Sequence, residues 1–316
     1  MNYKKNIYRS MIVAHKLTKF GSVPLHNDES YHPFFIIGSG RSGNTLLRRI
    51  LNNHPTLFIP PETYELGRSI RQSLKYPFMS WMDLVSLIYS NFQFNAEFET
   101  FGMDNLAELY HRVAQVKKPL RSVAYVINAF YGYYREVHKL DSSRWGDKTP
   151  LNTFSISEIH SVFPNAKFIH IMRDPVDCVA SFLKAELFGD IRAATSRWQQ
   201  SLEASIRFGR THSDQYLELT YENLVRTPES TVQRACAFLK VDYLPSLLSL
   251  TDTNHLGDVA LRKHHYNVKN PINTQSIGNG YRQLHPKDIE LIEGILMKSK
   301  NRRVRKILSQ YWSGRL

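Results

Sequence analysis

The stretch from Phe34 to Thr45 constrains the fold of this chain more than any other. It opens with four apolar residues, 34–37, which are typical of a strand buried on both faces of a parallel sheet. Three glycines follow, and apolar residues then recur at helical spacing: Leu46, Leu47, Ile50 and Leu51. A strand, a glycine-rich loop and a helix in this order gather backbone N–H groups at the positive end of the helix. We therefore predict a phosphate or sulfate site in this loop.

One position narrows the kind of anion. Gly38 and Gly43 match the two glycines of the nucleoside-triphosphate loop G-x-x-x-x-G-K-[ST], and Thr45 matches its hydroxyl position. Asn44 stands where that loop has its lysine, which argues against a nucleotide kinase. The cation lies inside the loop instead, at Arg41. The alternative interpretation is a glycine-rich turn without a ligand.

Length and charge set broad limits. With 316 residues the chain can bury a large core as one large or two smaller α/β domains. Lysine and arginine number 41 against 28 acidic residues, and the net charge of +13 favours anionic partners such as a nucleotide, an acidic glycan or nucleic acid. Two cysteines, Cys178 and Cys236, are too few for a disulfide framework or a thiolate metal site. We expect a reducing, cytoplasmic location.

The chain reads as one domain. The apolar run at 11–14 is too short for a signal-peptide core or a membrane span. We expect a basic N-terminal segment at 1–30 and a single domain at 31–316. The pattern from about 66 to 140 is helical and predicts an inserted helical cap. Further strands are expected at 57–59, near 145, at 167–172 and at 216–219, with helices at 156–163, from 174, at 191–208, at 228–240 and after Pro286; a polar loop spans 251–283, and a basic stretch, 298–306, lies within the last helix.

Glu62 is the first candidate for chemistry. It follows the short strand at 57–59 and the prolines that end it. Residues just past the carboxyl ends of strands line the ligand crevice of an open parallel sheet. We therefore expect Glu62 to face the same space as the loop at 38–45. Glu65 follows within the same turn and is the alternative base.

Arg173 and Ser181 form a second candidate anion site. Arg173 ends the strand at 167–172, and Asp174 caps the helix that follows. Ser181 lies two turns along that helix, on the face that points back toward the arginine. A guanidinium fork with a nearby hydroxyl suits a phosphate monoester. The alternative interpretation is an exposed Arg173 paired with Asp177.

Several of these patches together resemble the sulfotransferase superfamily, most closely the branch that contains tyrosylprotein sulfotransferases and many bacterial members. The resemblance covers most of the chain outside the helical block. It rests on five patches in the family's order and, more weakly, on a sixth at Ser276: the loop Gly38–Thr45, Pro61-Glu62, Gly146-Asp147-Lys148-Thr149-Pro150, Arg173-Asp174-Pro175 with Ser181, and Tyr221-Glu222-Asn223-Leu224 with Pro228. It implies a P-loop-like three-layer α/β fold with a central parallel sheet.

The resemblance also implies a reaction. Members of this superfamily transfer a sulfuryl group in-line from PAPS, 3′-phosphoadenosine 5′-phosphosulfate, to a hydroxyl, and release PAP without a metal. By position, Glu62 is similar to the catalytic base, Lys148 and Arg41 to the cations at the sulfuryl group, and Ser276 to a serine at its oxygens. Arg173 and Ser181 correspond to the residues that bind the 3′-phosphate. Other donor-binding positions that the resemblance implies are Gly40, Ser42, Gly43, Asn44, Thr45, Tyr221 and Arg282.

Departures from the family concern the acceptor. Tyr64 stands where tyrosylprotein sulfotransferases have an arginine that holds an acidic peptide, which argues against a peptide acceptor. Tyr281 takes the place of the usual tryptophan with one extra residue before it, so the register from Gly278 to Arg282 differs. A hydroxyl on a carbohydrate, a lipid-linked glycan or a small metabolite is expected instead.

Alternatives stay open at two levels. Lys148 can pair with its neighbour Asp147 rather than act on a substrate, and His54 and His170 are interpreted as structural. For the whole chain, the alternatives are a nucleotide kinase-like transferase and a non-catalytic binder of nucleic acid or acidic glycan. The binder explains the charge of +13, but not the ordered patches.

Overall fold

The chain forms two compact units in a computed structural model that describes Ser10 and residues 23–27, 31–249 and 270–313. Unit 1 comprises Met1–Phe35, His54–Lys167 and Thr253–Leu261. Unit 2 comprises Ile36–Asn53, Phe168–Asp252 and Arg262–Leu316. Neither unit is a continuous stretch of sequence. Among the described residues, no helix is both long enough and apolar enough to cross a bilayer.

Five strands form the central parallel sheet, as predicted. They are β1 (Phe34–Ile37), β2 (Leu57–Phe58), β3 (Arg144–Asp147), β4 (Lys167–Met172) and β5 (Tyr216–Thr220). The order is β2-β3-β1-β4-β5, and the pairs β1/β3, β2/β3 and β4/β5 are parallel. In the register, Phe34 lies opposite Gly146 and Met172 opposite Thr220. All four side chains of β1 are fully buried, because a strand inside a parallel sheet is covered on both faces.

Helix α2 (Asn44–Asn52) follows the glycine loop, as the sequence predicted. Gly43 is its N-cap residue and has a left-handed backbone conformation, which glycine adopts without a steric penalty. Leu47, Ile50 and Leu51 are fully buried, so the apolar face of α2 faces the protein interior.

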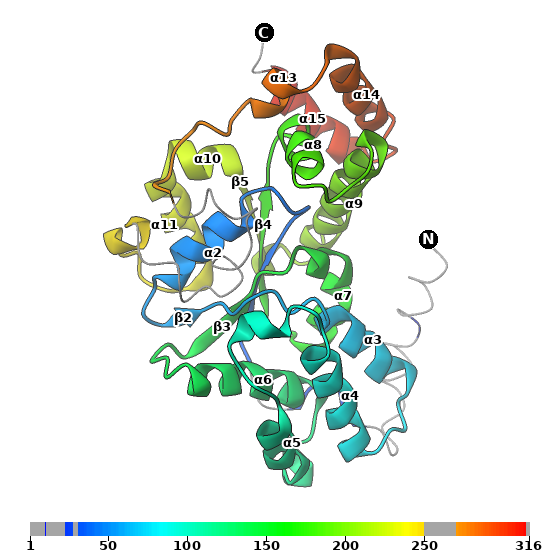
Figure 1. Cartoon of the computed structure of the whole chain (residues 1–316), viewed down its shortest axis with the longest axis vertical. Coiled ribbons are helices and arrows are strands. Elements are labelled where there is room, and N and C mark those ends of the chain that lie inside the picture. Colours follow the sequence, from blue (N-terminus) through cyan, green and yellow to red (C-terminus); the bar gives the residue numbers. More distant parts are fainter. Residues whose placement is uncertain (1–9, 11–22, 28–30, 250–269, 314–316) are drawn as a thin grey trace. The chain divides into compact units, whose positions relative to one another are not determined.

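The helical block of unit 1 contains α3 (Leu66–Lys75), α4 (Trp81–Gln93), α5 (Ala107–Ala114) and α6 (Val123–Val137), and α7 (Ile156–Val162) follows β3. Helices α4, α5 and α6 pack against one another (Figure 1). Ser80 and Ser122 cap α4 and α6 by accepting from the backbone N–H groups three residues on. Most aromatics of the block are core residues, but Phe94 at the end of α4 is 81% exposed.

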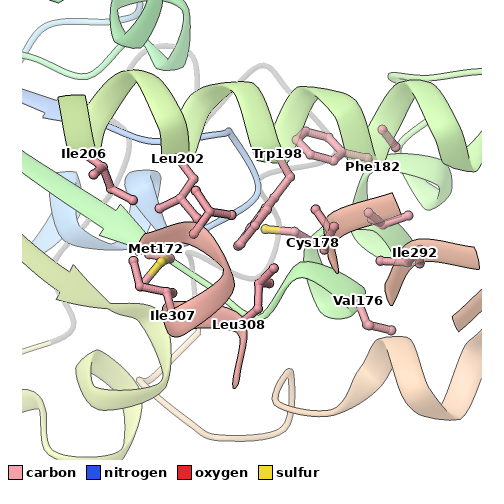
Figure 2. Close-up of a cluster of buried hydrophobic side chains, with 14 residues drawn as sticks. Met172, Val176, Cys178, Phe182, Trp198, Leu202, Ile206, Ile292, Ile307 and Leu308 are labelled. Carbon is pink, nitrogen blue, oxygen red and sulfur yellow. The ribbon is translucent and has the colours of Figure 1, made fainter. Parts of the chain in front are cut away.

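The core of unit 2 is built by β4 and the helices α8 (Pro175–Lys184), α9 (Ile191–Gly209), α14 (Pro286–Met297) and α15 (Arg302–Ser313). Figure 2 shows Trp198, Leu202 and Ile206 on α9 packed with Ile307 and Leu308 of α15. Helices α10 (Tyr221–Arg226), α11 (Pro228–Leu239) and α13 (Asn279–Gln283) also belong to this unit.

The C-terminal region differs from the prediction in two ways. The expected last helix is two helices, because α14 ends at Met297 and α15 begins at Arg302, so Lys298 and Lys300 of the basic stretch lie in the break. The expected polar loop at 251–283 contains the short helix α13, while its first part lies outside the described residues. Most of the basic segment at 1–30 also lies outside them.

Candidate functional site

The glycine loop of unit 2 has the backbone of an anion site. Gly40, Arg41 and Gly43 all have positive φ angles of 84°, 54° and 93°, and α2 begins directly after them. Alternating backbone conformations of this kind turn successive N–H groups toward one concave point. A Cβ atom at Gly43 would lie 2.6 Å from Cδ2 of Tyr221. Only glycine therefore allows the loop to pass this close to the tyrosine ring.

Two arginines from different parts of the sequence meet at this loop. Arg41 donates from Nε to Oγ of Ser181 over 3.0 Å. Arg173 donates from Nη1 to the carbonyl oxygen of Arg41 over 3.3 Å and from Nη2 to that of Ser276 over 2.5 Å. Its guanidinium also lies over the ring of Tyr221, 4.6 Å from the centroid. The structure thus brings together in unit 2 residues that the sequence placed at separate patches.

Buried hydrogen-bonding groups at this point are unsatisfied. Asn44 is 3% exposed, and neither its Oδ1 nor its Nδ2 has a hydrogen-bond partner among the described residues. The same holds for Nε of Arg173, which is 7% exposed. Buried polar atoms normally find a partner because an unmade hydrogen bond is unfavourable by about 1–3 kcal/mol. We call Arg41, Asn44, Arg173, Ser181 and Ser276 the anion cluster, and its open donors and two cations suit a phosphorylated or sulfated ligand.

The anion cluster is braced by carboxylates that the sequence did not single out for this role. Asp177 accepts from the backbone N–H of Gly278 over 2.8 Å and of Gly280 over 2.7 Å, and lies 3.6 Å from Nη2 of Arg173. Asp174 caps α8 as predicted and also accepts from the hydroxyl of Tyr281. The alternative interpretation is right about the pairing, since Arg173 lies beside Asp177, but wrong about the exposure, because the arginine is buried. The sequence feature that could have indicated this role is the position of Asp174 and Asp177, which lie close together just after the end of β4.

The remaining predicted donor positions lie in this region with different surroundings. Ser42 is buried and bonds to Ser39 over 2.7 Å and to Sγ of Cys178 over 3.2 Å. Burial raises the pKa of the Cys178 thiol to about 11, so the thiol is neutral beneath the loop. Thr45 is half-buried. Arg282 is exposed and donates to the carbonyl oxygens of Gln275 and Ile277 in its own segment.

Glu62 and Lys148 form an ion pair in unit 1. Lys148 is fully buried and Glu62 is 9% exposed. The predicted alternative, a pair between Lys148 and Asp147, is not what the structure shows, because Asp147 bonds to other groups. Glu65, the alternative base, accepts instead from Asn95 and Arg68. The two carboxylates therefore differ in their partners: Glu62 is paired with the fully buried Lys148, and Glu65 with the exposed Arg68.

Among the described residues, the carboxylate of Asp147 accepts hydrogen bonds only from neutral side chains. Its Oδ2 accepts from Oγ1 of Thr63 over 2.9 Å and from the hydroxyl of Tyr131 over 2.7 Å, and its Oδ1 accepts from Nδ2 of Asn152 over 2.7 Å. Burial is the main cause that raises the pKa of this carboxyl. Thr149 is also part of the network, since its Oγ1 accepts from the backbone N–H of Thr63 over 3.0 Å. We call Glu62, Thr63, Asp147, Lys148 and Thr149 the Glu62 cluster.

The two histidines have local partners. In unit 1, Nδ1 of His54 lies 2.9 Å from Oγ1 of Thr56. In unit 2, Nδ1 of His170 lies 2.8 Å from the hydroxyl of Tyr216 and 3.7 Å from Oε2 of Glu218. No group of three or more His, Cys, Asp or Glu side chains in the described part of the chain is arranged to hold a metal ion.

Comparison with known proteins gives a consistent result. Residues 33–245, more than half of the chain, match the sulfotransferase family. In sequence, the chain is similar to a putative protein-tyrosine sulfotransferase of Caenorhabditis briggsae, with 24% identity over 253 residues that cover 77% of this chain and 78% of the relative.

Two solved structures are similar in fold. The sulfotransferase domain of the olefin synthase from Synechococcus PCC 7002 has a TM-score of 0.58 and 25% identity, over 85% of this chain and 96% of that domain. Mouse sulfotransferase SULT7A1, solved in complex with PAP, has a TM-score of 0.50 and 12% identity, over 92% of this chain and 91% of the mouse chain. At 12% sequence identity, the similarity to the mouse protein shows only a shared fold.

Proposed function

This chain belongs to the sulfotransferase family, and on that premise we propose that it transfers a sulfuryl group from PAPS to the hydroxyl of a non-peptide acceptor. The observation that carries the choice of donor is the anion cluster. Two arginines and two serines from four segments converge there, and Asn44 and Arg173 keep buried polar atoms without a protein partner among the described residues. An anionic ligand with several oxygen atoms satisfies such a site.

The anion cluster supplies the contacts that PAPS needs. We assign the 3′-phosphate to Arg173 and Ser181, and the 5′-phosphosulfate to the backbone N–H groups of residues 40–45 and to Arg41. Ser276 and Lys148 are assigned to the sulfuryl oxygens. The contacts of Tyr221 and Arg282 with the donor stay predictions. When bound, PAPS supplies an electrophilic sulfur atom and a phosphate leaving group.

The chain's own residues then account for the transfer. Glu62 takes the proton of the acceptor hydroxyl, and the acceptor oxygen forms a bond to sulfur while the bond from sulfur to the bridging phosphate oxygen breaks. Lys148 and Arg41 hold positive charge where negative charge develops on the sulfuryl and bridging oxygens. A preorganised donor of this kind typically contributes about 3 kcal/mol to lowering the barrier. The products are the sulfated acceptor and PAP.

The acceptor is proposed from Tyr64. Tyr64 has a φ angle of 54° and lies two residues after Glu62 in the sequence. This is the position where tyrosylprotein sulfotransferases have the peptide-binding arginine. The similarity to protein-tyrosine sulfotransferases makes an acidic tyrosine peptide the competing acceptor.

We place the enzyme in the cytoplasm because both cysteines are unpaired and buried.

Ligand-induced thermal stabilisation tests the donor. PAP should raise the melting temperature far more than AMP, because only PAP carries the 3′-phosphate. A ligand at 100 times its Kd stabilises by about 2.7 kcal/mol. Equal shifts with PAP and AMP would contradict the roles of Arg173 and Ser181, and a larger shift with ATP and magnesium would favour a kinase instead.

Turnover of labelled PAPS tests the reaction and the acceptor together. The panel should contain hydroxylated sugars, lipid-linked glycans, small alcohols and phenols, and an acidic tyrosine peptide. We expect transfer to a non-peptide hydroxyl. Transfer to the peptide alone would overturn the acceptor class, and binding of PAP without any turnover would favour a non-catalytic binder.

A further inference from the structure

Asp147 is a buried carboxylate whose surroundings are unusual. It is 1% exposed and receives hydrogen bonds from Thr63, Tyr131 and Asn152, which come from three separate segments of unit 1. Each of these donors is neutral. A buried anion that lacks a cation partner in contact is unfavourable, and an apolar or amide side chain would fill the same space at a lower free energy. Packing alone therefore does not account for an aspartate here.

Two hydrogen bonds of this cluster connect the residue next to Glu62 with the residues next to Lys148. Thr63 directly follows Glu62, and Asp147 and Thr149 flank Lys148. Thr63 is tied twice, by its N–H to Oγ1 of Thr149 and by its own Oγ1 to Asp147. These two hydrogen bonds tie the residue after Glu62 to the residues on either side of Lys148, the partner of Glu62 in the ion pair.

A carboxylate is the side chain that suits this position. It accepts hydrogen bonds at both oxygens and donates none, so it can take the hydroxyls of Thr63 and Tyr131 and the amide of Asn152 at once. Asparagine offers one acceptor oxygen and would set its amide hydrogens against one of these donors. The neighbouring ring of Trp145 stacks on Tyr131 with centroids 3.7 Å apart, which keeps the tyrosine hydroxyl in place.

From this geometry we propose that Asp147 is a positioning residue, which holds Glu62 and Lys148 in register through Thr63 and Thr149. The proposal rests on the proposed function for the catalytic roles of Glu62 and Lys148. The placement of the pair itself follows from hydrogen bonds within unit 1. Misplacing a reacting group by about 1 Å can lower a rate on the order of a hundredfold, so loss of either tie to Thr63 should be visible in turnover.

The test uses three threonine variants of the full chain. Thr63→Val removes the hydroxyl that donates to Asp147 and keeps the size of the side chain, while Thr63→Ser restores the hydroxyl. Thr100→Val is the matched control, because Thr100 is a buried threonine of the same unit whose hydroxyl donates to the carbonyl oxygen of Glu97. Each variant is first checked for its melting temperature and for stabilisation by PAP.

The first measurement needs no substrate. The rate at which the buried amine of Lys148 is modified by a reductive methylation reagent is followed by mass spectrometry. We expect Thr63→Val to speed this modification by roughly tenfold, with Thr63→Ser and Thr100→Val close to the wild type. An unchanged rate in Thr63→Val overturns the proposal. A changed rate in a protein without sulfuryl transfer leaves the positioning role intact and contradicts the proposed function.

The second measurement separates positioning from general stability. With PAPS and the best acceptor, kcat of Thr63→Val should fall on the order of tenfold or more, while KM for PAPS stays within about twofold. Thr63→Ser should restore most of kcat. If Thr63→Ser is as slow as Thr63→Val, or if kcat and the affinity for PAP fall together, the role is a structural one and the proposal is wrong.

Discussion

The anion cluster of unit 2 and the Glu62 cluster of unit 1 satisfy their buried polar groups in opposite ways. In the anion cluster, Asn44 and Nε of Arg173 have no partner among the described residues. In the Glu62 cluster, no buried side-chain nitrogen or oxygen of the described atoms is unpartnered, and the one buried cation already has its counter-ion.

This difference separates two kinds of site. A group of buried donors without partners gains its missing hydrogen bonds when a ligand arrives, so affinity should depend on the ligand's charge and oxygens. A fully bonded network holds its side chains in place before any ligand is present. We therefore expect substitutions in the anion cluster to change binding, and substitutions in the Glu62 cluster to change the rate of the reaction.

The largest effect is expected from Glu62→Gln, which keeps the shape of the side chain and removes its ability to take a proton. Turnover should fall by about 10²- to 10⁴-fold, the usual contribution of a general base, while PAP still stabilises the protein. Glu65→Gln is the matched control three residues away and should stay within about twofold of the wild type. A comparable loss of turnover in both variants would contradict the prediction, because it would not distinguish Glu62 from Glu65 as the base.

The next largest effect is expected from Arg173→Ala. Loss of a charge-assisted contact with the 3′-phosphate should weaken PAP binding by about 10- to 100-fold, with AMP binding little changed. Isothermal titration with both ligands measures the difference. Arg207→Ala removes the same charge from an exposed position on α9 and should leave both affinities unchanged. If Arg173→Ala instead lowers kcat at unchanged PAP affinity, the division between binding and rate is wrong.

A smaller effect, on stability, is expected from a pair of glycine variants in unit 2. Gly43→Ala places a Cβ in a left-handed conformation and 2.6 Å from the ring of Tyr221, so the free energy of unfolding should fall by about 1–3 kcal/mol. Gly294→Ala, in the interior of α14 with nothing within 4 Å, should raise it by about 0.5–1 kcal/mol. Urea denaturation measures both, and the same sign for both would show that backbone conformation does not decide the loop.

The smallest effect is expected from the thiol beneath the anion cluster. Because the pKa of Cys178 is raised to about 11 in the folded protein, the folded state holds this proton more tightly than the unfolded state. The resulting stability is present below the ordinary thiol pKa and is lost as the pH rises toward 11, by at most about 1.4 kcal/mol per pH unit. Cys178→Ala should flatten this part of the stability profile. If Cys178→Ala leaves the slope of the unfolding free energy against pH unchanged, the prediction is wrong and water reaches the thiol beneath the loop.

Much of the anion cluster could be predicted because its signals are local. The strand, glycines and helix of 34–52 follow one another directly, and β4 was predicted with the bounds that the structure has. Asp174 next to Pro175 is typical of a helix start, and α8 begins there. Such features depend on neighbouring residues, which sequence patterns record.

The Glu62 cluster was harder to predict because its partners are distant in the sequence. Asp147 adjoins Lys148, and a pair between them was a reasonable alternative. Tyr131 and Thr63 decide otherwise, since they occupy the carboxylate from 16 and 84 residues away. The division of the last helix into α14 and α15 was missed because the polar stretch at 298–301 contains neither glycine nor proline, the residues that usually mark a helix end.

The hydrogen bond between Arg41 and Ser181 joins residues that are 140 positions apart. At a synthesis rate of about 5–20 residues per second, on the order of ten seconds separate the moments at which the ribosome makes the two. The carbonyl of Ser276, 103 positions beyond Arg173, comes later still. A growing polypeptide thus carries the anion cluster incomplete for much of its translation, and the cluster can form only when late segments have joined an early one.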